Sequence, residues 1–300
     1  MRLVYMAGKG GVGKSVCSAA TGLWTSEQGK KTLAFSMDPA HSLSDILEAD
    51  IGDQPTPIAE NLYAVEPDLA AEAEKFYAAY RSLFRALFEM FSFEVRPADF
   101  GVLPGVGELI FMDRLYDVYM EGDYEVVVID SAPTALVLPL LKLPEVTTGV
   151  VTRLLGMKSR WTGIFNMLEP GFGDSVVKEV RRLRTKAETM RNALIDPEIT
   201  TISVVTIPEK AAVMESERLI KTVEAHGVTV DSIIVNHVMA PCDCDYCSRR
   251  VASQKGYIEE IKTKFANKQI ALLPSYGEEV KGPGLAQVAR DLYERGQVRI

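Results

Sequence analysis

The stretch Gly8-Lys9-Gly10-Gly11-Val12-Gly13-Lys14-Ser15 decides how this chain folds. It follows the apolar run 3–6 and matches the pattern G-x-x-x-x-G-K-[S/T], in which the backbone N–H groups of a glycine-rich loop surround phosphate oxygens. A glycine-rich turn that fits by chance is the alternative, but a strand before the loop and a helix after it favour a nucleotide site. The residues expected to bind the nucleotide here are Gly8, Gly10, Gly11, Val12, Gly13, Lys14, Ser15 and Val16.

The segment after this loop is expected to form a helix over about 15–26 that directs its positive end at the bound phosphates. Lys14 is expected to contact the β- and γ-phosphates as a catalytic residue, and the Ser15 hydroxyl to bind Mg²⁺. The motif therefore indicates a nucleoside triphosphate bound with Mg²⁺, which we take to be ATP.

Short β-rich runs alternate with helical segments along the chain. These runs lie at 3–6, 32–36, 62–66, 126–130, 201–206, 232–236 and 269–273, and several are continuous aliphatic stretches typical of strands buried on both faces. The alternation predicts an α/β fold, the mostly parallel, doubly wound sheet of a P-loop NTPase, in a single ATPase domain over 1–300. Its ligand should lie beyond the carboxyl ends of the strands.

Two aspartates follow predicted strands at that same edge. Asp38, in the run Asp38-Pro39-Ala40-His41, is positioned to orient a water for attack on the γ-phosphate, and we expect it to be catalytic and close to Mg²⁺. Asp130, in the run Asp130-Ser131-Ala132-Pro133, is the residue expected to hold Mg²⁺ together with Ser15. Either aspartate alone would read as a helix cap, and the phosphate loop upstream favours the functional interpretation.

Two amphipathic stretches do not resemble the helices that connect parallel strands. Apolar residues recur at helical spacing over 73–91 and again over 146–168. Such faces usually pack on a sheet, but their aromatic and methionine content is also compatible with an inserted α-helical subdomain formed by about 70–120 and 145–195. A groove for an apolar client there would include Met157, Trp161, Phe165 and Leu168.

Composition limits the possible partners and location. A net charge of −8 argues against nucleic acid, which requires a basic face. The N-terminus enters a strand directly, without a signal peptide, and we expect a cytoplasmic protein that reaches a membrane only transiently, through a partner. Three of the four cysteines crowd together as Cys242, Cys244 and Cys247, a pattern that suits metal or metalloid binding better than disulfides. Cys17 is expected to be a buried, apolar residue.

The chain resembles the ArsA family of ATPases over almost its whole length. The resemblance runs through GKGGVGKS, DPAHSLSD, DSAPT, the segment Glu215-Ser216-Glu217-Arg218-Leu219, the run Ile234-Val235-Asn236-His237, the CxxC of Cys244 and Cys247, and the terminal Leu273-Pro274 with Glu279-Val280-Lys281-Gly282. It implies that Asn236 reads the adenine edge and that Pro274 flanks the base. It also implies that Lys9 is the second lysine of a deviant Walker A loop, which contacts the nucleotide of a partner subunit. Because the chain has one phosphate loop, a homodimer is implied.

The resemblance does not decide whether the protein acts on a membrane protein or on a metalloid. The spelling DPAHSLSD and the CxxC are closer to the ATPase that targets tail-anchored membrane proteins, in which four thiolates from two subunits hold structural Zn²⁺. The resemblance then implies delivery of a hydrophobic client to a membrane receptor. Three thiols in each subunit also suit As(III) or Sb(III), so an ATPase that energises an arsenite or antimonite efflux permease is the alternative. A nucleotide-gated adaptor is a third possibility. The segment Thr134-Ala135-Leu136 departs from the family pattern, which has glycine and histidine after the threonine.

Overall fold

The computed structural model describes residues 1–37, 42–91, 106–130, 172–242, 244–294, 298 and 300. The chain divides into two compact units. One comprises Met1–Pro67, Gly122–Leu136 and Leu194–Ile300, and the other comprises Asp68–Glu121 and Val137–Ala193. We call them the sheet unit and the helical unit.

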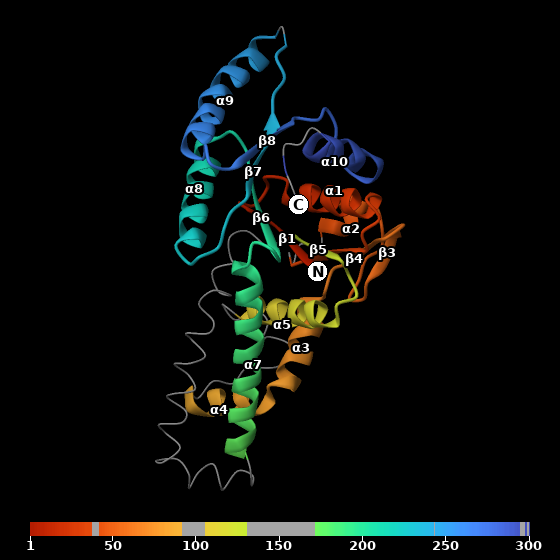
Figure 1. The fold of residues 1–300 in the computed structure, drawn as a ribbon, viewed down its shortest axis with the longest axis vertical. Coiled ribbons are helices and arrows are strands. Elements are labelled where there is room, and N and C mark those ends of the chain that lie inside the picture. Colours follow the sequence, from red (N-terminus) through yellow and green to blue (C-terminus); the bar gives the residue numbers. More distant parts are fainter. Residues whose placement is uncertain (38–41, 92–105, 131–171, 243, 295–297, 299) are drawn as a thin grey trace. The chain divides into compact units, whose positions relative to one another are not determined.

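The sheet unit is built on one sheet with the strand order β3-β4-β2-β5-β1-β6-β7-β8 (Figure 1). All neighbouring strands run parallel except β3 and β4, which are antiparallel. The α/β fold class predicted from the sequence is confirmed. The strands are β1 (Arg2–Gly8), β2 (Thr32–Ser36), β3 (Thr56–Ala59), β4 (Leu62–Val65), β5 (Val126–Asp130), β6 (Thr200–Thr206), β7 (Ser232–Val238) and β8 (Gln269–Pro274).

The middle of the sheet is aliphatic and almost fully buried. All residues of β2, β5 and β6 are buried, as expected of parallel strands covered by helices on both faces. β1 lies between β5 and β6; the chain leaves β1 towards β2 on one side and leaves β6 towards β7 on the other, so the connections diverge between β1 and β6. In doubly wound sheets such a switch point opens the crevice in which ligands bind.

Helices of the sheet unit cover this sheet (Figure 1). α1 packs against α10, where the Thr21 hydroxyl lies 2.6 Å from the Tyr293 hydroxyl and the ring of Trp24 stacks on that of Tyr293. α8 packs on β6 and α9 on β7. The elements are α1 (Lys14–Glu27), α2 (Ser42–Leu47), α8 (Lys210–Glu224), α9 (Asp245–Lys264), the 3₁₀ turn η2 (Gly282–Gly284) and α10 (Leu285–Tyr293).

The helical unit contains α3 (Leu69–Ala79), α4 (Arg81–Phe91), α5 (Val106–Glu121) and most of α7 (Phe172–Ile195). The prediction of a single helix over 73–91 is wrong, because α3 ends at Tyr80, where φ is −123°, and α4 begins at the next residue. The Tyr80 hydroxyl donates to Asp113 at 2.7 Å. The carboxylate of Glu179 accepts the N–H groups of Ser82 and Leu83, which starts a new helix.

A buried lysine ties α7 to α5 within the helical unit. The side chain of Lys186 is 5% exposed, and its ammonium lies 2.9 Å from Asp113 and 2.8 Å from Asp117. Burial raises the pKa of Tyr80, and the charge of Asp113 raises it further. Tyr80 therefore stays a hydroxyl donor to Asp113 at any physiological pH.

Candidate nucleotide site and cysteine cluster

The phosphate-loop motif forms the connection between β1 and α1. Gly13 lies in the left-handed region, with φ 93°, and no side chain caps the first turn of α1. The N–H groups at this end of the helix can therefore point at an anion. Lys14 is 5% exposed, and its ammonium donates to the carbonyl of Lys9 at 3.1 Å, so its charge lies over the loop itself.

Two glycines of the loop are required by packing as well as by ligand access. A Cβ on Gly8 would lie 2.2 Å from the carbonyl oxygen of Val205 in β6. A Cβ on Gly13 would lie 2.2 Å from the Nδ2 atom of Asn236 in β7. Since no carbon tolerates such distances, the loop can lie against both strands only with glycine at these positions.

Two of the residues predicted to bind Mg²⁺, Ser15 and Asp130, are hydrogen-bonded to the residues that flank the segment 38–41. Met37 donates its N–H to the carbonyl of Asp130 at 2.8 Å, and the Ser42 hydroxyl donates to that of Ser15 at 2.9 Å. Asp130 is fully buried at the end of β5, and its carboxylate accepts the Ser18 hydroxyl at 3.4 Å. Asp38 itself lies outside the described residues, but the residues that flank its segment are bound to the two predicted Mg²⁺ ligands.

A buried glutamate that the motifs did not indicate fixes the start of α2. Glu66 follows β4 and is 2% exposed, and its carboxylate accepts the N–H of Leu43 at 2.7 Å and that of Ser44 at 3.2 Å. It also accepts the hydroxyl of Ser44. A negative charge at this end of a helix is favourable. Since Ser42 begins the same helix, Glu66 indirectly holds the Ser42–Ser15 contact. An acid directly after an aliphatic strand was the available sequence signal.

A cavity of about 400 Å³ adjoins the loop, a volume suited to a small ligand. Asn236 lines it and donates its Nδ2 to the carbonyl of Val12 at 2.9 Å, so the residue predicted to read adenine contacts the phosphate loop directly. Pro274 ends β8 beside Val238 but is not in the cavity wall. The wall is formed by Gly13, Val16, Ser42, Asp45, Ile46, Asn236, His237, Leu273, Tyr276, Glu278, Glu279, Val280 and Val288.

A larger cavity, of about 770 Å³, lies at the other edge of the sheet. It is lined by residues near the amino ends of β1 and β5, such as Arg2 and Val126, and by the stacked rings of Trp24 and Tyr293. None of its lining residues belongs to the phosphate loop. Of these two cavities, only the smaller one therefore adjoins the phosphate loop.

Lys9 is accessible. Its side chain is 43% exposed, and its ammonium lies 3.9 Å from Glu215 of α8. An exposed pair at this distance contributes little to stability. Lys9 can therefore leave Glu215 at small cost.

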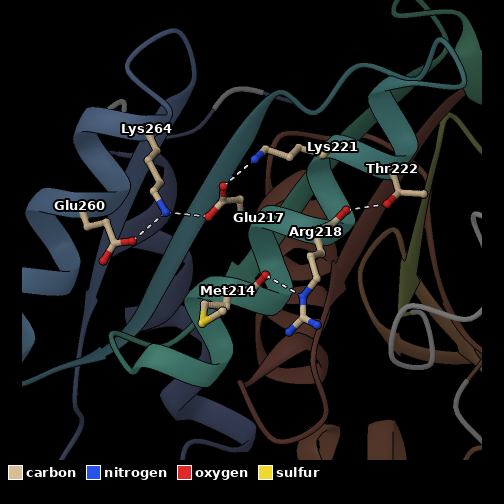
Figure 2. A network of polar contacts seen from close by, with 7 residues as sticks. All are labelled: Met214, Glu217, Arg218, Lys221, Thr222, Glu260 and Lys264. Carbon is tan, nitrogen blue, oxygen red and sulfur yellow. Dashed lines mark hydrogen bonds and ion pairs between the residues drawn. The ribbon is translucent and has the colours of Figure 1, made fainter.

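Helix α8, which contains Glu215, is joined to α9 by a network of ion pairs (Figure 2). The carboxylate of Glu217 accepts from Lys221 at 2.7 Å and from Lys264 of α9 at 2.6 Å, and Lys264 also pairs with Glu260. Hydrogen bonds from Lys221 and Lys264 lower the pKa of Glu217 to about 2. The hydrogen bonds of Lys264 to Glu217 and Glu260 raise the pKa of Lys264. A second pair, Arg250 with Glu209 at 2.8 Å, joins the same two helices.

The cysteine cluster lies at the amino end of α9. The sulfur atoms of Cys242, Cys244 and Cys247 all lie within 4.8 Å of one another, and Cys244 caps the helix by accepting the N–H of Cys247. This backbone bond and hydrogen bonds from the thiols of Cys247 and Cys242 lower the pKa of Cys244 to about 7. Hydrogen bonds with Cys242 and Cys244 raise the pKa of Cys247 to about 12. Thiolates are the ligands that soft metal ions prefer, so the set fits such an ion.

The predictions for Cys17 and for the apolar groove have different outcomes. Cys17 is fully buried, and burial raises the pKa of its thiol to about 12, so it is the inert core residue that was expected. The predicted groove residues Met157, Trp161, Phe165 and Leu168 lie outside the described residues. Among the helices described, none combines the length and the apolar character needed to cross a lipid bilayer.

Comparison with known proteins gives one family. The model of the anion-transporting ATPases matches residues 1–294. An Aquifex aeolicus protein named as an arsenical pump-driving ATPase is 30% identical over 300 residues, which cover 94% of this chain and 76% of that protein. The ATPase ASNA1 homolog 1 of Paramecium tetraurelia is 28% identical, with 96% and 91% covered, and the ATPase GET3A of Arabidopsis thaliana is 28% identical, with 94% and 80% covered.

Proposed function

Since this chain belongs to the anion-transporting ATPase (ArsA) family, we propose that it hydrolyses ATP at the loop between β1 and α1, as a Mg²⁺-dependent homodimer. One observation carries the choice of site. The buried Lys14 and Asp130 and the half-buried Ser15 lie at the switch point of the sheet, and the segment that contains Asp38 is attached on both sides to residues of this set.

The chain's own groups supply the parts that phosphoryl transfer needs. Gly8, Gly10, Gly11, Val12, Gly13 and Val16 surround the phosphates, and the ammonium of Lys14 neutralises charge that develops on them. Ser15 and Asp130 offer oxygen ligands, which Mg²⁺ prefers, and the ion would neutralise further charge on the phosphates. Asp38 orients the attacking water. Asn236 and the loop that follows Pro274 hold the base.

Mutation of Asp38 tests this site. Asp38→Asn should bind ATP as the parent does and hydrolyse it at least about a hundredfold more slowly, since orientation of the water is lost. ATP binding by calorimetry and phosphate release in the same preparation separate the two effects. Parental turnover by Asp38→Asn would remove Asp38 from the mechanism.

The homodimer is tested through Lys9. We propose that two copies close around ATP and that the accessible Lys9 of each contacts the nucleotide of its partner, stabilising charge in the transition state. Lys9→Ala should lower turnover and leave folding unchanged. The matched control is Lys30→Ala, which removes another exposed lysine from a surface pair. A monomer in sedimentation with ATP and Mg²⁺, or parental turnover by Lys9→Ala, would refute this arrangement.

As client we propose the hydrophobic segment of a tail-anchored membrane protein, carried through the cytoplasm to a membrane receptor. The motif resemblance supports this choice, as does a helical unit whose α3 and α4 carry the stacked rings of Tyr77, Phe84 and Phe88. An apolar peptide of about 20 residues should co-purify with the parent. Aspartate at Met157 and Phe165 should abolish this, and unchanged capture by that variant would refute the groove.

The cysteine cluster favours a second candidate, an ATPase that energises an arsenite or antimonite efflux permease. Three sulfur atoms within 4.8 Å match the thiolate set that As(III) or Sb(III) takes, and a relative named for an arsenical pump is among the matches. Arsenite should then stimulate ATP turnover, and Cys242→Ser should abolish the stimulation. One Zn²⁺ per dimer, retained in Cys242→Ser, would instead assign Cys244 and Cys247 to a shared structural zinc site.

A further inference from the structure

The carboxyl end of β7 contains a bend at a residue that is not glycine. His237 has φ 55°, in the left-handed region that side chains with a Cβ rarely adopt. The pairing with β8 shifts register between Val235 and Val238, so one extra residue is inserted on β7. Such a β-bulge re-aims the neighbouring side chain, which here is Asn236.

The buried side-chain amide of Gln254, on α9, forms hydrogen bonds with the backbone at this bend. Gln254 is 4% exposed, and its Nε2 donates to the carbonyl of His237 at 3.0 Å. Its Oε1 accepts the N–H of Met239 at 2.8 Å. Backbone groups on both sides of Val238 are therefore bound to a single side chain, which provides the surrounding constraint that a strained conformation needs in order to persist.

The bend determines where the amide of Asn236 points. Asn236 accepts the N–H of His237 at 2.9 Å through Oδ1 and donates to the carbonyl of Val12 through Nδ2. These two bonds use one of its two N–H groups and one of its two oxygen lone pairs. One donor and one acceptor remain on a residue that lines the cavity, and such a pair recognises the N6 and N7 edge of adenine.

We propose that Gln254 is a positioning residue for nucleotide binding, which fixes the bend at His237 so that the Asn236 amide faces the base. This inference rests on the proposed function, because it takes Asn236 as the group that reads adenine. Gln254 contacts no nucleotide atom. Its effect passes through two backbone hydrogen bonds and the bulge, which predicts a change in base selectivity as well as in affinity.

The test compares the affinities of full-length variants for AMPPNP and GMPPNP, which are not hydrolysed. Gln254→Leu keeps the size and removes both bonds, and it should weaken AMPPNP binding by about tenfold, the upper range for one well-placed hydrogen bond. GMPPNP binding should change less, so the preference for adenine narrows. Lys255→Ala, at the exposed neighbouring position on α9, is the control and should bind as the parent does.

A second substitution separates positioning from a general loss of packing. Glycine adopts a φ of 55° without the cost that a Cβ brings, so His237→Gly in the Gln254→Leu background should restore part of the lost affinity and selectivity. If Gln254→Leu lowers the yield of folded protein, Gln254→Glu gives the same comparison. It keeps the acceptor for Met239 and removes the donor to His237.

Two results would overturn the inference in distinguishable ways. If Asn236→Ala loses the preference for AMPPNP while Gln254→Leu and Gln254→Glu keep it, the role of Gln254 is refuted and the proposed base contact stands. If Asn236→Ala itself keeps the preference, the assignment of Asn236 is refuted, and the inference about Gln254 fails with it.

Discussion

Replacement of Glu66 by glutamine is expected to loosen the start of α2 and to raise the Mg²⁺ concentration that ATP turnover requires. The carboxylate accepts three donors, the N–H groups of Leu43 and Ser44 and the Ser44 hydroxyl. A hydrogen bond to a charged group contributes about 1 kcal/mol more than one to a neutral group, so loss of the charge should weaken this attachment by about 2–3 kcal/mol. A change of about 2 kcal/mol is about thirtyfold in the equilibrium between attached and detached α2.

The measured quantity is the Mg²⁺ concentration that gives half-maximal ATP turnover. Ser42 touches the proposed Mg²⁺ ligand Ser15 only while α2 is attached, and apparent affinity scales with the attached fraction. The half-saturating concentration should therefore rise, by at most about thirtyfold if the attachment weakens by about 2 kcal/mol, with a smaller change of kcat at saturation. The control is Glu72→Gln, which changes another buried glutamate, on α3 in the helical unit. Equal half-saturating concentrations in both variants would refute the reasoning.

Three further outcomes are expected. Gly13→Ala should abolish ATP binding in calorimetry and lower the melting temperature, because its Cβ would overlap the Asn236 amide, and ATP binding at parental affinity would contradict the geometry. Glu217→Gln should be less stable than the parent near neutral pH. The Glu217 pKa is depressed to about 2, so the difference in urea unfolding should shrink as pH falls from 4.5 towards 2, and a constant difference would contradict the assignment. Lys186→Met should destabilise the protein to urea by about 3 kcal/mol, because two acids lose their buried partner, and Asp113→Asn should restore part of this. Parental stability of Lys186→Met would show that the network contributes nothing.

The central strands could be predicted from sequence because they are short runs rich in aliphatic and β-branched residues. β3 (Thr56–Ala59) was missed, since it is a four-residue edge strand that contains Pro57 and alternates half-buried with exposed positions. The break at Tyr80 was also missed. Apolar periodicity continues through α3 and α4, and the break depends on bonds to Asp113 and Glu179, which lie far along the chain.

Some residues of the candidate site could likewise be predicted from sequence, and others could not. The loop 8–15 and Asp130 are marked by a dense local motif, so their common location at the strand ends could be predicted. Glu66 and Gln254 are single polar residues whose importance depends on backbone groups that only the folded chain brings to them. A sequence pattern carries no signal for such pairs beyond an unexpectedly buried polar residue.

The contact between the phosphate loop and Asn236 has a consequence for the order of events during synthesis. The amide and the Val12 carbonyl that it binds are separated by 224 positions. A ribosome-bound chain that ends before β7 would hold a complete glycine motif at its start without the side chain that braces it. The ability to retain ATP should therefore arise in translation only after β7 has left the ribosome.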